Sequence, residues 1–181
     1  MMRSAKATFP MPVDGLVPYS PPGLLVDTLE SVTPNSVVCG VTVGSRDSVA
    51  YTEDGELPVM CLLELMAQTI SVWNAYCGSR GNRKNRFGLL VDVDRFIVTR
   101  NSDLPKGMQL RITAQVELNE RPPSYSSRNL LTINYRGYVK FSCDVKDVYE
   151  NEIISTARLT GVVPSERQIH DLQKRTELSA L

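Results

Sequence analysis

The sequence predicts one α+β domain in which a single buried helix packs against a long antiparallel sheet. Two observations lead to this prediction. Apolar and polar residues alternate in several separate segments, which is typical of strands with one buried face. One longer segment, residues 58–77, breaks the alternation and contains no turn residues. A chain of 181 residues suits one domain, and a hydrophobic content of 42 % allows a sizeable core.

Period-two patterns predict the strands. Residues 36–44 and 110–118 alternate, and residues 131–145 keep the same period for longer than most strands do, which implies a strongly curved sheet. Asn151 is expected in a hairpin turn before a strand over residues 153–163. A further strand pair is expected over residues 24–29 and 87–99.

The segment 58–77 is predicted to be the helix. Pro58 suits a first helical turn and Gly78 suits a C-terminal cap. Because the segment is apolar almost all round, we expect the helix to be buried. The strand pattern ends near residue 164, so residues 1–164 are assigned to the domain and residues 165–181 to a C-terminal helix or flexible tail.

Composition excludes several classes of protein. Lys+Arg and Asp+Glu number 20 each, so the basic excess of a nucleic-acid-binding protein is absent. We expect no membrane span, because no run approaches about 20 apolar residues, and the opening residues lack the apolar core of a secretory signal. Four cysteines without a CxxC pair indicate free thiols, no zinc site and a cytoplasmic location.

Glu64 is the first candidate for chemistry. It lies within the apolar helix, with Gln68 one turn later on the same face. Burial raises the pKa of a carboxyl group, which suits a proton donor near neutral pH. The alternative is that Glu64 and Gln68 form the solvent-exposed stripe of the helix, and the pattern leaves both interpretations open.

Three motifs resemble the hot-dog-fold 3-hydroxyacyl-[acyl-carrier-protein] dehydratases. Residues 60–68 (Met-Cys-Leu-Leu-Glu-Leu-Met-Ala-Gln) are similar to the family's central helix, and residues 18–27 (Pro-Tyr-Ser-Pro-Pro-Gly-Leu-Leu-Val-Asp) to its opening motif. Residues 87–90 and 104–110 resemble its turn into a later strand. The form Leu-Pro-(x)5-Glu-x-Met-Ala-Gln most resembles the dehydratase-like proteins of aryl polyene clusters. The resemblance implies a long curved sheet wrapped round one helix, and no metal or redox cofactor.

The departures from this family decide the expected mechanism. Tyr19 stands where the family has its catalytic histidine, and tyrosine is a poor base at neutral pH. The only histidine, His170, lies past the last strand and is not expected to replace it. The glycine that follows the helix-start proline in the family is also absent, and Met60-Cys61 stands in the position of the family's Met-Pro-Gly. Backbone N–H groups at the helix start remain candidates for binding a thioester carbonyl.

Further candidates concern the substrate carrier. Arg80, Arg83, Lys84 and Arg86 form a basic cluster after the helix that would steer an acidic acyl carrier protein with its phosphopantetheine arm; the alternative is a solvated loop. Cys61 is a candidate substrate contact, although a small residue that allows close packing is the simpler interpretation.

The resemblance implies active sites between two subunits, one giving the histidine and the other the acid. We therefore expect this chain to form a heterocomplex with a histidine-bearing hot-dog dehydratase paralogue. Glu64 would protonate the leaving hydroxyl, Gln68 would orient Glu64, and Tyr19 would lie in a second, inactive pocket. The alternatives are a non-catalytic structural subunit and a hot-dog acyl thioesterase.

Overall fold

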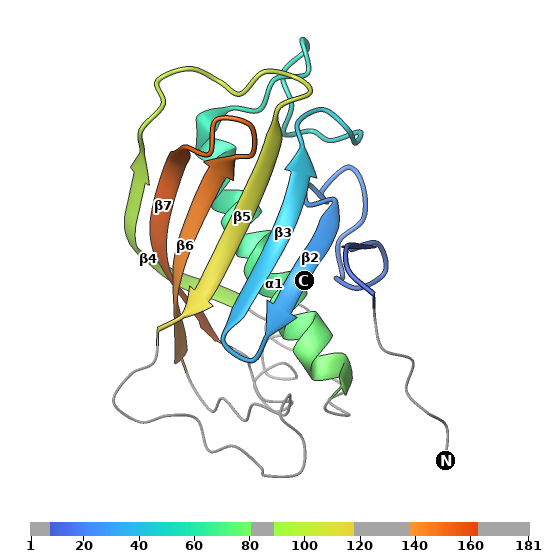
Figure 1. Ribbon diagram of the computed structural model, residues 1–181, viewed down its shortest axis with the longest axis vertical. Coiled ribbons are helices and arrows are strands. Elements are labelled where there is room, and N and C mark those ends of the chain that lie inside the picture. The colour runs from blue at the N-terminus through green and yellow to red at the C-terminus, as the bar shows by residue number, and fades with distance from the viewer. Residues whose placement is uncertain (1–7, 81–88, 118–137, 163–181) are drawn as a thin grey trace, which may run out of the picture.

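The computed structural model describes residues 8–80, 89–117 and 138–162, and all structural statements below refer to these residues. One antiparallel sheet of seven strands wraps round a single long helix (Figure 1). The strand order is β1-β2-β3-β5-β6-β7-β4. The elements are β1 (Met11–Pro12), β2 (Thr28–Thr33), β3 (Ser36–Thr42), the 3-10 turn η1 (Val59–Cys61), α1 (Leu62–Arg80), β4 (Leu89–Val98), β5 (Gln109–Val116), β6 (Tyr138–Asp147) and β7 (Ile153–Val162).

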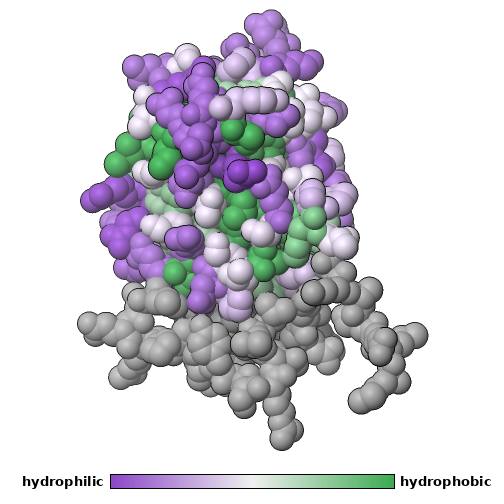
Figure 2. Space-filling model, viewed as in Figure 1, coloured by the Kyte–Doolittle hydropathy of each residue, from purple (hydrophilic) through white to green (hydrophobic). Residues whose placement is uncertain are grey.

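The predicted strand faces are confirmed. In β5, Leu110, Ile112 and Ala114 are buried while Arg111 and Gln115 are exposed. In β3 and β6 the apolar members of the alternation are likewise buried. The outer face of the sheet is largely hydrophilic (Figure 2). A single layer of apolar side chains therefore joins the inner face of the sheet to the helix.

The turns that enter and link these strands follow local residue chemistry. Asn151 has a positive φ of 54° and lies in the β6–β7 hairpin, as predicted. Gly107, at φ 87°, closes the turn that leads into β5. The expected strand over residues 131–145 is described only from Tyr138, and residues 131–137 lie outside the described part of the chain.

Two strand predictions were wrong. The strand expected over residues 24–29 begins only at Thr28, because the N–H groups of Leu25 and Val26 donate to the side chain of Gln68 instead of to a neighbouring strand. β2 and β4 also do not pair with each other. β2 pairs with β1 and β3, whereas β4 pairs with β7 at the edge of the sheet.

The helix is confirmed, with different ends. It starts with η1 after Pro58 and continues through Gly78 to Arg80, so Gly78 does not end it. A glycine inside a helix is tolerated at a cost of about 1 kcal/mol relative to alanine. Trp73 is anchored by an indole N–H that donates to the Thr33 carbonyl at 3.1 Å, and its ring packs edge-on against Phe141 at 5.4 Å.

α1 packs chiefly against β5 and β3, and the edge strand β4 extends beyond it. As a result, β4 carries several large hydrophobic residues that are at least 39 % exposed: Leu90, Val91, Val93 and Ile97. Val93 faces the same side of the sheet as the core, because its cross-strand neighbour Leu159 is buried. Part of the inner face of the sheet is therefore uncovered.

Candidate functional site

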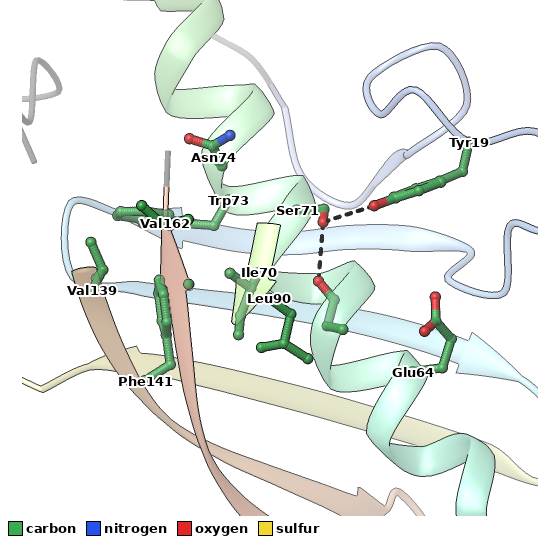
Figure 3. A pocket seen from close by; sticks show the side chains of 12 residues that line it. Tyr19, Glu64, Ile70, Ser71, Trp73, Asn74, Leu90, Val139, Phe141 and Val162 are labelled. Atoms are coloured by element: carbon green, nitrogen blue, oxygen red, sulfur yellow. Dashed lines mark hydrogen bonds between the residues drawn. The ribbon is translucent and has the colours of Figure 1, made fainter. Parts of the chain in front are cut away.

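A pocket of about 180 Å³ lies where the inner face of the sheet extends past α1 (Figure 3). One wall is the helix, the other is formed by β4, β6 and β7, and the loop before β2 contributes one aromatic ring. The lining residues are Tyr19, Glu64, Ala67, Ile70, Ser71, Trp73, Asn74, Leu90, Val139, Phe141, Gly161 and Val162. Most of this surface is apolar, and its polar groups come from the helix and from Tyr19.

Three polar side chains follow one face of α1. Glu64, Ser71 and Asn74 are spaced seven and three residues apart, which places them on the same side of a helix. Glu64 lies at one end of the pocket and Asn74 at the other (Figure 3). Only Glu64 had been predicted from the sequence. Continuing its helical stripe would have identified the other two.

Glu64 is exposed in the chain described here. The expectation that it is buried inside the apolar helix is therefore wrong for the single chain, and the alternative of an exposed stripe is correct for this residue. The physical reason is the orientation of α1, which turns Leu62, Leu65 and Met66 into the core and leaves Glu64 on the side away from β3 and β5.

Gln68 behaves differently from Glu64, because it is only 1 % exposed. Its Nε2 donates to Glu64 Oε1 at 2.9 Å and to the Gly23 carbonyl at 2.8 Å. Its Oε1 accepts from the N–H of Leu25 at 2.8 Å and from that of Val26 at 3.4 Å. Gln68 thus fixes one oxygen of Glu64 and also ties the 23–26 segment, which follows Tyr19, to the helix.

Tyr19 lines the same pocket as Glu64. The Tyr19 hydroxyl lies 3.4 Å from Ser71 Oγ, which is long for a hydrogen bond between hydroxyl groups. Ser71 Oγ donates to the Ala67 carbonyl at 3.1 Å (Figure 3). The ring is 36 % exposed. We expected Tyr19 and Glu64 to belong to separate pockets, but within one chain they share a single pocket.

Asp27, the last residue of the opening motif, has a structural role that the sequence did not reveal. Its carboxylate accepts from the Thr42 N–H at 2.7 Å, from Ser45 Oγ at 2.9 Å and from Arg46 Nε at 2.6 Å. Arg46 also pairs with Asp14 and holds the pKa of that carboxyl below its usual range. This cluster connects the strands on either side of the Tyr19 loop.

The start of the helix is already engaged by protein groups. The Val59 N–H donates to Asp103 Oδ1 at 3.3 Å, and the Cys61 N–H donates to the Pro58 carbonyl at 2.8 Å. Cys61 itself does not line the pocket. Its thiol lies 4.0 Å from the Ala50 carbonyl, and burial raises its pKa, which disfavours a reactive thiolate.

The remaining cysteines are also free thiols. Burial raises the pKa of Cys39 and of Cys143 to about 12. No group of three or more His, Cys, Asp or Glu residues suited to a metal ion occurs in the described ranges. Within those ranges, too, no helix has the length and apolar character needed to cross a membrane.

The basic cluster predicted after the helix cannot be placed. Arg83, Lys84 and Arg86 lie outside the described residues, and the side chain of Arg80 is not described. His170 and the whole segment 165–181 also lie outside them.

One long antiparallel sheet wrapped round a single helix is the hot-dog fold, as predicted. The model of the ApeP-like family, described as ApeP dehydratase, matches residues 11–174. The chain therefore belongs to the ApeP-like dehydratase family.

Solved structures agree on the fold. A chain of the dehydratase heterocomplex ApeI:P from Xenorhabdus doucetiae superimposes with a TM-score of 0.70 at 23 % identity, over 90 % of this chain and 97 % of that one. A hypothetical thioesterase with coenzyme A from Streptococcus pneumoniae gives 0.51 at 14 % identity, over 76 % and 87 %. A Streptococcus mutans protein bound to acetyl CoA gives 0.52 at 10 % identity, over 78 % and 90 %. No curated protein matches the sequence.

Proposed function

We propose that this chain is a subunit of a heteromeric dehydratase that acts on 3-hydroxyacyl thioesters of an acyl carrier protein, in the synthesis of aryl polyenes. The partner is a histidine-bearing hot-dog paralogue. One observation carries the proposal: Glu64, an exposed carboxylate, stands at one end of an apolar pocket, with one oxygen already held by Gln68. Membership of the ApeP-like dehydratase family supports the reaction class.

The reaction needs a base that this pocket does not contain. The single histidine of the chain is His170, and Tyr19 occupies the position of the family's histidine. In the proposed reaction a histidine of the partner subunit removes the proton alpha to the thioester carbonyl. Glu64, in its protonated form, gives its proton to the departing hydroxyl group. The products are a trans-2-enoyl thioester and water, and no metal or redox cofactor takes part.

The edge strand β4 is the proposed meeting point of the two subunits. Its free edge and its exposed Leu90, Val91, Val93 and Ile97 suit pairing with an equivalent strand of the partner. The uncovered inner face beside the pocket would then be closed by the partner. A partner lying over Glu64 would also shield that carboxyl from water.

The fold of this chain is similar to that of the two coenzyme-A-bound structures above, one of which is a hypothetical thioesterase. The fold therefore does not distinguish dehydration from thioester hydrolysis, and the reaction products must. The co-expressed complex would be given a 3-hydroxyacyl thioester on a carrier protein, and the products identified by mass spectrometry. An enoyl thioester supports the proposal, whereas a free acid and a free thiol would identify a thioesterase.

Replacing Glu64 tests its role within that assay. Glu64→Gln is expected to lower turnover by roughly 10²–10⁴, the usual contribution of a general acid. Glu53→Gln, an exposed glutamate in the loop before the helix, is the matched control and should leave the rate unchanged. An unchanged rate for Glu64→Gln would instead favour a structural subunit. Exclusive homodimers with full dehydratase activity would exclude the heteromeric assembly.

A further inference from the structure

The pocket contains one polar group that the proposed reaction does not use. Asn74 lies at the end of the pocket opposite Glu64 (Figure 3). Both residues are on α1 and are ten positions apart, which corresponds to about 15 Å along the helix axis at a rise of 1.5 Å per residue. Asn74 is therefore too far from Glu64 to take part in the same proton transfer.

The Asn74 amide is buried without a partner. The residue is 9 % exposed, and its Nδ2 forms no hydrogen bond. Its pocket neighbours Trp73, Val139 and Phe141 have rings or aliphatic groups that offer it no acceptor within the described residues. Native proteins rarely leave a buried donor unpaired, because its lost hydration is not replaced. In this orientation Nδ2 is closed off from the cavity, so the donor is completed only if the amide turns its N–H groups to the cavity side and an acceptor there receives them.

The other polar groups of the pocket are already engaged. Glu64 accepts from Gln68, and Ser71 contacts Tyr19 and the Ala67 carbonyl. The indole N–H of Trp73 donates to Thr33. The Asn74 amide can also exchange its oxygen and nitrogen by a half-turn of the side chain, so its N–H groups can be turned toward the cavity.

We propose that Asn74 is a specificity-determining residue that hydrogen-bonds an oxygen atom carried by the tail of the acyl substrate. The inference rests on the proposed function, because it takes Glu64 as the reacting end of the pocket. An extended chain advances about 1.2 Å per bond, so 15 Å places that oxygen roughly twelve bonds from the reacting carbon. The preferred substrate is then a long acyl thioester with a hydroxyl or carbonyl oxygen near its far end, not a plain alkyl chain.

The test compares two 3-hydroxyacyl thioesters of about fifteen carbons, one ending in a methyl group and one in a hydroxymethyl group. Wild-type heterocomplex is expected to favour the hydroxylated substrate in kcat/KM by about tenfold, the worth of one net hydrogen bond. Asn74→Leu removes the amide while keeping the branched shape of the side chain and should abolish this preference, while Asn74→Ser, which keeps a hydroxyl, should retain part of it. Thr69→Val, a buried change elsewhere on α1, should leave the ratio unchanged.

A binding measurement separates this inference from the proposed reaction. Saturated acids of the same length, with and without the terminal hydroxyl, cannot be dehydrated, and their affinity for the complex can be measured by calorimetry. A preference for the hydroxylated acid that Asn74→Leu removes supports the role of Asn74 even if no turnover is seen. The same ratio in wild type and Asn74→Leu, or no preference in wild type, would overturn the inference while leaving dehydration untouched.

Discussion

Gln68 ties the 23–26 segment, which follows Tyr19, to α1, so its replacement by methionine should make the protein easier to unfold. Gln68→Met keeps the length of the side chain and removes all four hydrogen bonds. The Leu25 N–H, which is buried, would lose its partner at a cost of about 1–3 kcal/mol. The bonds to Gly23 and Glu64 add about 1 kcal/mol each, since both partners can be hydrated. We therefore expect a loss of roughly 4 kcal/mol in the free energy of unfolding, a large part of the stability of an average domain.

The assay is urea unfolding at fixed protein concentration, followed by the fluorescence of Trp73. This is the only tryptophan of the chain and is 3 % exposed, so it reports loss of the core. With an m-value of about 2 kcal/mol/M, the midpoint should fall by roughly 2 M. Thr69→Val is the control, because its hydroxyl bonds a carbonyl that the helix already uses, and it should shift the midpoint by less than about 0.5 M. Equal shifts for the two variants would refute the assigned role of Gln68.

The other predictions concern assembly, the pocket and the thiols. Val93→Lys should prevent formation of the heterocomplex in native mass spectrometry, whereas Lys140→Glu on the outer face should not; assembly by Val93→Lys would exclude β4 as the interface. Tyr19→Phe should keep dehydration by the complex within about threefold if, as proposed, the base belongs to the partner, and a loss of a hundredfold would place Tyr19 in the reaction. Asn74→Leu should not lower the melting temperature, because it removes an unpaired buried amide; a fall of more than about 4 °C would indicate a structural bond. At pH 8, iodoacetamide should label Cys61 before Cys39 and Cys143, whose raised pKa and burial suppress the thiolate, and peptide mass spectrometry would show the order.

Local periodicity predicted the elements and their buried faces because each depends on nearby residues. The alternation of β5 states directly which side chains leave water, whereas the apolar run of α1 predicted the helix but not which of its sides is buried. The contact between Glu64 and Gln68 followed from their i, i+4 spacing. Strand order did not follow, because pairing between distant strands leaves no local period, and so the edge position of β4 came only from the structure.

Contacts between residues that are distant in the sequence also account for what the sequence did not predict at the site. Asp27 was visible as part of a motif, but its partner Arg46 lies nineteen residues away on another loop. The burial of Leu25 and Val26 suggested a strand, since the sequence cannot show that a glutamine side chain from the helix takes their N–H groups. A side-chain acceptor that replaces a neighbouring strand therefore explains the late start of β2.

The environment of Glu64 depends on a surface that the chain does not cover by itself. α1 is apolar almost all round, yet only one side of it meets the sheet, and Leu63 and Ile70 on its other side remain half-buried. The inner face of β4 beside it is also apolar and exposed, at Leu90 and Val93. Two uncovered apolar surfaces that flank one carboxylate are stabilised only when a third surface closes over them. We therefore expect the surroundings of Glu64 in the proposed heterocomplex to be completed by the subunit that covers this pocket rather than by this chain alone.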